Sequence, residues 1–309
     1  ENLSFFDNRI IYGEDIDLWY RIMLHNECVY EDKVFSYYRI DAENRACNHV
    51  FPLEIHIPYY IEKYSEERKN NIKYIIDSGT LLGAVRHGGF IPWDDDVDVS
   101  MLREDYDKFC RVCKTDLDKK YFLQTHKTDK GYRWEYARIL KNGTVYIRKD
   151  HEELKSRNGI FIDIFPRDNV PENGMGHHFC NSLSWLCRKM LYSEVGEHHA
   201  KGTWNKVGFA FLNLFPKSLA HKGVEYLVRK YKDIETEKVR CFGWGSRAET
   251  KGYRKEWYVD TCDIEFDGIT VKAPVKTHEY LVHAFGEDYM TPPPEDKRQP
   301  IHTAKYIKF

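Results

Sequence analysis

Two aspartates alternate with valines in the segment Asp96–Val99, and this pattern is the strongest chemical signal in the sequence. Strict alternation is typical of a β-strand, where every second side chain points to the same face. The two aspartates would then lie on one face, about 6–7 Å apart along the backbone. A third acid, Asp163, interrupts the apolar segment 160–165, where an unpaired ionised carboxylate would be costly to bury. If the two strands are neighbours, Asp96, Asp98 and Asp163 supply the hard oxygen ligands that Mg²⁺ or Mn²⁺ prefers. The sequence therefore predicts a divalent metal site.

The acidic segment has two other interpretations. A calcium-binding EF-hand loop is excluded because, counting from Asp94, its sixth and twelfth positions are Val99 and Asp105 instead of Gly and Glu. The remaining alternative is a solvated acidic strand without a metal. Alternation with valine, between Trp93 and Met101, favours the metal site over that alternative.

A small-residue turn, Ser78–Gly79, lies between an expected strand at 72–77 and an expected helix at 80–87. Free backbone N–H groups and the helix dipole favour an anion at such a junction, so the turn is a candidate phosphate site. Arg86 and Arg138 are candidate phosphate clamps because a guanidinium can bind phosphate through two nitrogens. Simple solvation at the surface is an equally good interpretation of both arginines.

A second helix is expected over 103–117, with an apolar stripe that includes Cys110 and Cys113. Half a zinc site is the alternative for these two thiols, with the segment His177–Cys180 as its partner. Core packing is favoured, because free cysteine behaves as a small hydrophobic residue. The apolar segment 207–219 is expected to form a buried helix, with an interfacial segment that reaches a lipid-linked acceptor as the alternative.

The 309 residues (36.8 kDa) carry a formal net charge of −2, which argues against a protein that binds nucleic acid by bulk charge. The eight cysteines have no disulfide-framework spacing, so a reducing cytoplasm is expected, with contact to the inner face of the membrane as a further expectation. Because the chain opens Glu-Asn-Leu-Ser, we also expect its natural N-terminus to lie upstream.

Four segments together resemble the LicD family, which includes fukutin and fukutin-related protein. The first is DSGTLLGAVRHGGFIPWDDDVD (77–98), and the second is NGIFIDIFP (158–166). The segment 138–144 is similar to the region between them, and YLVHAFGEDYMTPPPEDKR (280–298) resembles the C-terminal block. The resemblance covers about 70–309, in the family's order.

This resemblance implies an α/β (α+β) fold with a polymerase-β-like nucleotidyltransferase core and added helices. It also implies metal-dependent transfer of phosphocholine or an alditol phosphate from a CDP-activated donor to a glycan or lipid-linked glycan, as in the modification of lipopolysaccharide, teichoic acid or capsule. Carried onto this chain, it makes Asp96, Asp98 and Asp163 the metal ligands and Ser78–Gly79 the phosphate turn. Asp163 is the expected carboxylate nearest the acceptor hydroxyl, with Asp94 second.

The N-terminal segment has a different resemblance. Gly13–Ile22 and Val34–Arg39 look like the final acidic motif and closing strand of a family-2 glycosyltransferase, whose nucleotide-binding half is missing here. We therefore expect residues 1–60 to be a glycosyltransferase remnant and 61–309 to be the LicD-like domain. Two alternative functions are glycosyl transfer by Glu14 or Asp15 and a non-catalytic glycan-binding pseudoenzyme.

Overall fold

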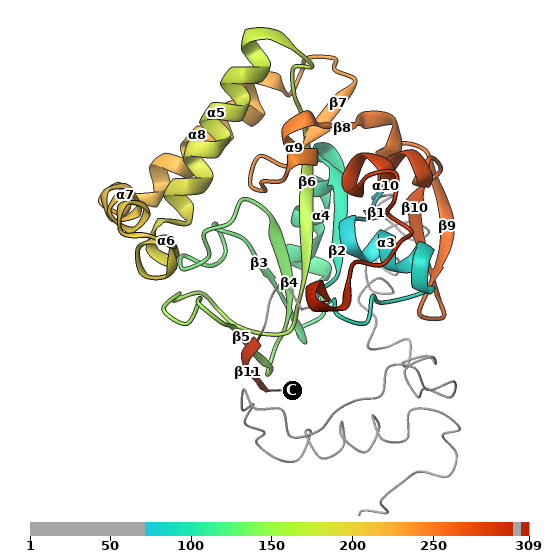
Figure 1. The fold of residues 1–309 in the computed structure, drawn as a ribbon, viewed down its shortest axis with the longest axis horizontal. Helices are drawn as coiled ribbons and strands as arrows, with labels where there is room; N and C mark the ends of the chain where they lie inside the picture. The colour runs from blue at the N-terminus through green and yellow to red at the C-terminus, as the bar shows by residue number, and fades with distance from the viewer. Residues whose placement is uncertain (1–71, 95, 299–303, 309) are drawn as a thin grey trace, which may run out of the picture.

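The structure is a computed structural model that describes residues 72–94, 96–298 and 304–308. The expected glycosyltransferase remnant at 1–60 and its boundary with the following domain lie outside the described residues. The described part of the chain forms a mixed sheet with helices packed around it (Figure 1), which confirms the predicted α/β class.

A seven-stranded sheet organises the described residues, in the order β1-β2-β6-β4-β3, with β7 paired to β6 and β8 to β7. β2 and β6 are parallel, whereas the other pairs in this sheet are antiparallel. The strands are β1 (Ile75–Ile76), β2 (Asp98–Leu102), β3 (Tyr121–Gln124), β4 (Ala137–Lys141), β6 (Phe161–Asn169), β7 (Lys238–Arg240) and β8 (Tyr253–Arg254).

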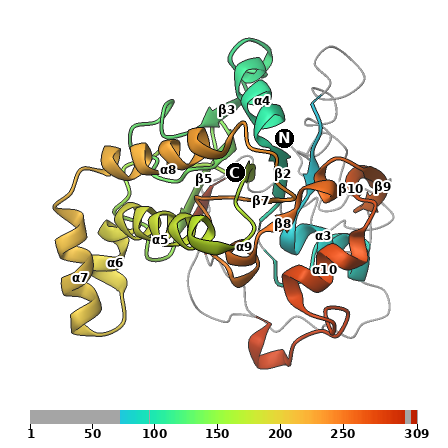
Figure 2. The ribbon, with the colours of Figure 1, turned by 90° about the horizontal axis from the view of Figure 1, so that it is seen from above.

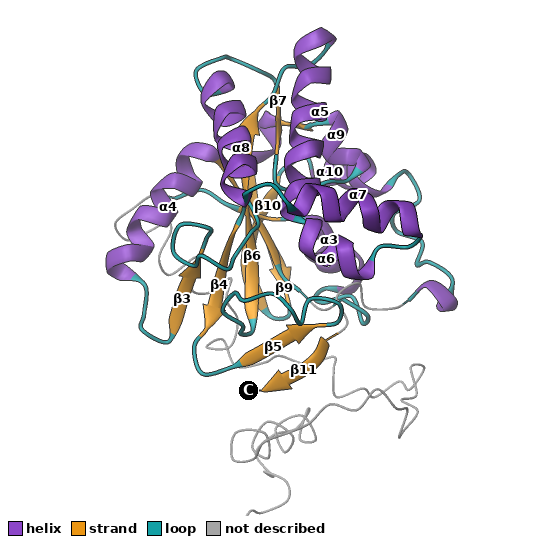
Figure 3. Ribbon diagram, turned by 90° about the vertical axis from the view of Figure 1, so that its left-hand side faces the viewer, coloured by secondary structure: helices purple, strands orange, loops and turns teal. Residues whose placement is uncertain are grey.

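Two smaller antiparallel ladders flank this sheet. One pairs β9 (Thr261–Phe266) with β10 (Ile269–Pro274). The other pairs β5 (Val145–Arg148) with β11 (Ala304–Lys308), below the main sheet in Figure 3. This pairing brings residues 304–308 next to β5, the strand that comes before β6 in the chain.

The helices gather in two groups on either side of β6 (Figures 1 and 2). One group packs α5 along α8 and α6 against α7, and the other places α10 beside α3. Their bounds are α3 (Ser78–His87), α4 (Arg103–Asp116), α5 (Gly174–Leu191), α6 (Ser193–His199), α7 (Thr203–Asn213), α8 (Lys217–Tyr231), α9 (Arg247–Lys251), α10 (Thr277–Phe285) and the 3₁₀ turns η3 (Lys255–Tyr258) and η4 (Glu295–Lys297).

β6 is the central strand, and its first eight residues are all buried. A strand covered on both faces needs apolar side chains on both, which explains the run of Phe and Ile around Asp163. Ile162 and Ile164 pack with Val99 of β2 and with Phe109 of α4 in one hydrophobic cluster. The core thus holds β2 and β6 side by side, and the acidic residues are attached to these two strands.

The expected elements around the site are confirmed with small shifts in their ends. The helix predicted at 80–87 begins at Ser78, and the strand predicted at 72–77 is reduced to β1. The helix predicted at 103–117 is α4, where Cys110 and Cys113 pack against the core as free thiols. Burial raises the pKa of Cys110 to about 11, so it stays a protonated, unreactive thiol at neutral pH.

The prediction of a buried helix at 207–219 is wrong. The segment forms α7 and the start of α8, and no residue of α7 is buried. Phe211 is 60% exposed and Leu214 is 79% exposed. The apolar pattern predicted the helix correctly, but its neighbours α5 and α6 contact α7 without covering its outer face. No helix in the described ranges is both long and apolar enough to cross a bilayer.

Candidate active site

Asp96, Asp98 and Asp163 come together at the start of the parallel pair β2–β6. The register places Asp98 directly opposite Asp163, and the Asp163 N–H donates to the carbonyl of Val97 (3.1 Å). One carboxylate oxygen from each of the three acids lies within 4.8 Å of the others. Asp163 is buried, whereas Asp96 and Asp98 are partly exposed, so a ligand could approach the cluster from their side.

The first turn of α3 lies against this carboxylate cluster. The N–H of Asp98 donates to Thr80 Oγ1 (2.9 Å), and the N–H of Asp77 donates to the carbonyl of Asp98 (2.9 Å). Asp77 is the N-cap and accepts the N–H of Ser78 (2.6 Å). Ser78 has φ 47°, a left-handed conformation that costs about 1–2 kcal/mol for a residue with a side chain. Backbone strain of this kind is concentrated at functional sites.

Asp94 covers the predicted phosphate turn. A Cβ on Gly79 would lie 2.7 Å from Asp94 Oδ2, so the absence of a side chain at Gly79 lets the carboxylate approach the helix start. An anion and this carboxylate would repel each other in the same place. A phosphate could therefore bind beside Gly79 only together with a cation that answers Asp94.

The crowding of carboxylates affects the protonation of Asp98. Burial raises the pKa of Asp98 well above its ordinary value, and the neighbouring carboxylates of Asp96, Asp163, Asp77 and Asp94 raise it further. Carboxylates that crowd together in this way favour either a proton or a bound cation. The cluster thus has the oxygen donors and the electrostatic demand that fit a divalent ion.

Arg138 of β4 is the basic partner of Asp163. Its Nε donates to Asp163 Oδ1 (2.5 Å) and its Nη2 to Oδ2 (3.2 Å), while its guanidinium lies 3.8 Å from the ring centre of Phe161. Burial raises the pKa of Asp163, and the charge of Arg138 opposes that rise. Two of the three guanidinium nitrogens face the carboxylate, so a phosphate contact by Arg138 would have to use Nη1.

Arg86 lies away from the cluster. It stands eight residues along α3 from Ser78, which corresponds to about 12 Å of helix. Its Nη1 donates to the carbonyl of Tyr289 (2.9 Å), and its guanidinium lies 5.9 Å from the ring centre of Trp93, next to Asp94 in sequence. The ring of Trp93 is also 5.3 Å from the guanidinium of Arg298.

A buried ionic network, which sequence reasoning missed, supports the site from behind. Arg167 of β6 pairs with Asp77 and with Glu249 of α9, and its Nε donates to Ser100 Oγ (3.0 Å). Tyr280 Oη also donates to Asp77. All five residues are buried. The arginine within the apolar strand was the available signal, because a buried guanidinium requires acidic partners.

A cavity of about 520 Å³ opens on the side of the sheet that carries α5. Its walls combine aromatic rings with cations, including Trp134, Trp244, Arg148, Arg188 and Lys189. Trp134 and Arg148 also line a smaller cavity that reaches Arg138. The large cavity is therefore linked through shared side chains to the arginine that holds Asp163.

Comparison with known proteins gives consistent matches. The family model LicD/FKTN/FKRP, nucleotidyltransferase domain, matches residues 71–192. Lipopolysaccharide cholinephosphotransferase LicD of Haemophilus influenzae is 31% identical over 241 residues, which cover 75% of this chain and 87% of the relative. An uncharacterised protein of Rickettsia prowazekii is 33% identical over 186 residues, covering 58% of this chain and 60% of the relative.

Human ribitol 5-phosphate transferase FKRP is a more distant relative. It is 25% identical over 112 residues, which are 36% of this chain and only 23% of FKRP. The region matched by the family model contains the turn Ser78–Gly79. It also contains Asp96, Asp98 and Asp163, the three carboxylates that the fold brings together. From the family model and the extent of the match to the Haemophilus protein, the chain belongs to the LicD family, with a nucleotidyltransferase-like α/β domain.

Proposed function

We propose that this protein is a LicD-type phosphotransferase that moves phosphocholine or an alditol phosphate from a CDP-activated donor to a hydroxyl of a glycan or its precursor. The observation that carries this proposal is the convergence of Asp96, Asp98 and Asp163 beside the first turn of α3. The relatives named cholinephosphotransferase and ribitol 5-phosphate transferase support the class of group transferred.

The carboxylate cluster fits a divalent cation, with Asp96, Asp98 and Asp163 as ligands. Such an ion, Mg²⁺ or Mn²⁺, would neutralise charge on the donor pyrophosphate and the departing nucleotide. The raised pKa of Asp98 supports this assignment, because burial and four neighbouring carboxylates disfavour its charge when no cation answers it. At the predicted turn Ser78–Gly79, the Ser78 N–H already donates to Asp77, so the Gly79 N–H would bind a donor phosphate next to the ion.

In the proposed reaction, the acceptor oxygen forms a bond to the donor's β-phosphorus as the bond from that phosphorus to CMP breaks. The acceptor hydroxyl gives its proton to a carboxylate, for which Asp163 is the first candidate and Asp94 the second. Arg138 holds both oxygens of Asp163 and so orients it. The large aromatic and cationic cavity, which shares Trp134 and Arg148 with the smaller cavity at Arg138, is the proposed acceptor site, since flat rings and guanidinium groups suit sugars that carry phosphate.

Calorimetric titration of CDP-choline tests the metal assignment. We expect wild-type affinity to rise with added Mn²⁺ or Mg²⁺ and to collapse with EDTA. Asp163→Ala should abolish this metal dependence but also leave Arg138 buried without its partner, which lowers stability. Asp163→Asn, which can still accept a hydrogen bond from Arg138, separates the two effects. Chelator-insensitive donor binding in the wild type, together with a large drop in melting temperature for Asp163→Ala, would show that Asp163 has only a structural ion pair. Thermal shifts with CDP-ribitol, CDP-glycerol and UDP-sugars would identify the donor.

The pH dependence of stability follows from the raised pKa of Asp98. A carboxyl group whose folded pKa exceeds its unfolded value of about 4 destabilises the ionised fold above the folded pKa. This penalty shrinks as the pH falls below the folded pKa, where the folded state binds the proton, and it is gone below the unfolded pKa of about 4, where both states are protonated. With EDTA present, the melting temperature of Asp98→Asn should exceed that of the wild type near neutral pH, and the gap should close as the pH is lowered. A gap independent of pH would contradict the assignment.

We also propose that α7 contacts a membrane that carries the acceptor. The outer face of α7 is apolar, with Trp204 87% exposed, and residues 200–224 contain four lysines but no acid. An exposed apolar helix face with surrounding lysines is typical of helices that lie in an anionic lipid interface.

Cosedimentation with vesicles tests this contact. Binding should be stronger to phosphatidylglycerol vesicles than to phosphatidylcholine vesicles and should weaken with salt. The double variant Trp204→Ser and Phe211→Ser should lose binding, whereas Met175→Ser, which removes an equally exposed apolar side chain outside α7, should keep it. Equal binding by all three proteins would exclude α7 as the contact.

A further inference from the structure

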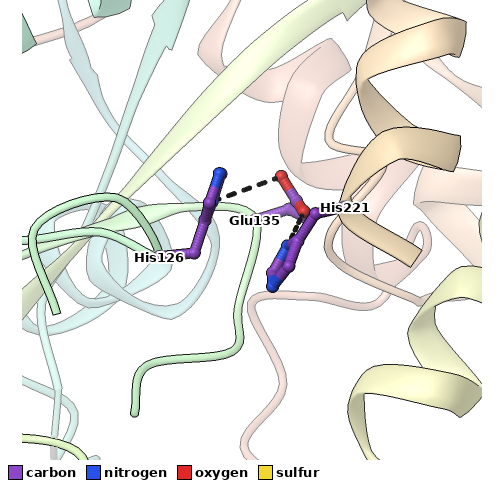
Figure 4. Close-up of side chains that lie close together, drawn as sticks. All are labelled: His126, Glu135 and His221. Carbon is purple, nitrogen blue, oxygen red and sulfur yellow. Dashed lines mark hydrogen bonds and ion pairs between the residues drawn. The ribbon is translucent and has the colours of Figure 1, made fainter. Parts of the chain in front are cut away.

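A second group of metal-ligating side chains lies outside the carboxylate cluster. His126 comes from the turn after β3, Glu135 from the segment before β4, and His221 from α8. Figure 4 shows both imidazoles turned toward the Glu135 carboxylate. His126 Nδ1 lies 3.8 Å from Glu135 Oε2, and His221 Nδ1 contacts Oε1. Three segments that are separate in sequence thus place their ligand atoms within 4.8 Å of one another.

These side chains are largely withdrawn from solvent. The exposed fractions are 26% for His126, 10% for Glu135 and 19% for His221. Within the described residues, both ion-pair partners of Glu135 are these histidines. Imidazole nitrogens and a carboxylate oxygen are ordinary ligands of metal ions, and solvent reaches these three side chains only in part.

We propose that His126, Glu135 and His221 bind Zn²⁺. Two imidazoles and a carboxylate suit zinc, whereas Mg²⁺ prefers oxygen ligands alone. Ligand atoms around a tetrahedral zinc ion are about 3.4 Å apart, so ligand atoms separated by up to 4.8 Å would have to approach by as much as about 1.4 Å. The imidazole rings lie face to face, with centroids 4.3 Å apart and planes at 19°, so coordination would also require one ring to rotate. Three protein ligands leave the fourth position to water.

The bound ion would connect the helical part of the molecule to the sheet. His221 stands on α8, and Glu135 lies three residues before Arg138, the partner of Asp163. Glu135 also packs against Gly243, because a Cβ added to Gly243 would lie only 2.7 Å from the Cβ of Glu135. The proposed role of the ion is structural, because these contacts fix the position of the segment that leads into β4. This inference does not rest on the proposed phosphotransferase activity.

Metal content and Co²⁺ spectra of the full chain test the site. The Asp98→Asn background weakens the carboxylate cluster as a competing site. After stripping with EDTA and dialysis, the protein should bind a single Zn²⁺ ion tightly, and Co²⁺ in its place should give the strong visible absorption of tetrahedral coordination. His126→Asn and His221→Asn should each weaken Zn²⁺ binding by more than about 100-fold, a larger loss than follows from changing a residue that only hydrogen-bonds to a ligand. Zn²⁺ should raise the melting temperature of the parent protein but not of these variants.

The matched control is His199→Asn, which changes a histidine in the more exposed group with Glu152 and Glu153. It should keep the parent Zn²⁺ affinity and the Co²⁺ spectrum. If His221→Asn fails to fold, the test uses two other variants: His126→Asn, which changes the more exposed histidine, and the isosteric change Glu135→Gln. Zn²⁺ affinity unchanged in His126→Asn, or no Zn²⁺ binding by the parent, would overturn the proposal and leave only two stacked histidines beside Glu135.

Discussion

Turnover of a CDP-activated donor falls by about 10³-fold or more in Asp98→Asn and in Asp96→Asn, while the fold remains intact. A Lewis-acidic ion contributes several kcal/mol to stabilising developing charge, and each 1.36 kcal/mol corresponds to a factor of ten. Asp98 lies opposite Asp163 in the register of β2 and β6, so its carboxylate is central to the proposed ion site. Donor hydrolysis with saturating Mn²⁺, measured beside thermal melting in EDTA, checks both parts of this expectation.

The stability of these variants distinguishes a catalytic effect from unfolding. Removing one of several crowded negative charges should leave the melting temperature in EDTA equal to or above that of the wild type. Asp233→Asn, an exposed change in the turn after α8, is the matched control and should keep wild-type turnover. Wild-type turnover in Asp98→Asn would refute the metal assignment, and a large loss of stability would place Asp98 in the scaffold.

Arg167→Met should lower the free energy of unfolding by about 3–5 kcal/mol, the usual cost of removing one partner from a buried ionic group. Arg167 pairs with both Asp77 and Glu249, and all three side chains are at most 2% exposed. Methionine fills much of the same volume but leaves two carboxylates buried without their cation. For a protein of this size the loss corresponds to a melting temperature about 10 °C lower. Arg167→Lys should rescue little, since a single ammonium cannot reproduce the fork that reaches both acids.

Arg229→Met provides the comparison for this network. Arg229 pairs with Glu225 one turn away on α8, and the two side chains are 76% and 51% exposed. Exposed pairs at this spacing contribute about 0.3–0.5 kcal/mol, so the melting temperature should barely change. Denaturant unfolding of both variants measures the difference. Similar small losses for Arg167→Met and Arg229→Met would mean that the Asp77 network does not support the site.

The pair of Arg138 and Asp163 shows why part of the site was missing from the sequence-based prediction. Alternation in Asp96–Val99 predicted a shared face for two carboxylates, and the isolated acid in an apolar strand predicted a charged partner for Asp163. Neither pattern identifies that partner, because Arg138 reaches Asp163 only through the antiparallel pairing of β4 with β6. Arg138 was therefore interpreted as a phosphate clamp, a role that it would have to combine with holding Asp163.

The exposed face of α7 shows a similar limit. The apolar spacing predicts a helix, since periodicity depends on neighbouring residues along the chain. It does not indicate whether another element covers that face. Whether the apolar face of α7 is buried depends on which surfaces remain free after α5 and α8 have packed together. The same apolar pattern therefore suits both a core helix and an interfacial helix.

The sequence by itself determined the helices and strands around the site, the shared face of Asp96 and Asp98, and the family. These features depend on consecutive residues, whose backbone angles and side-chain spacing are local properties. Only the tertiary structure decided that β2 lies parallel to β6 with Asp98 opposite Asp163, and that His126, Glu135 and His221 meet. Such meetings depend on which strand edges and apolar faces pair when the whole core is buried, because the free energy of burial belongs to the assembled layers and not to any single segment.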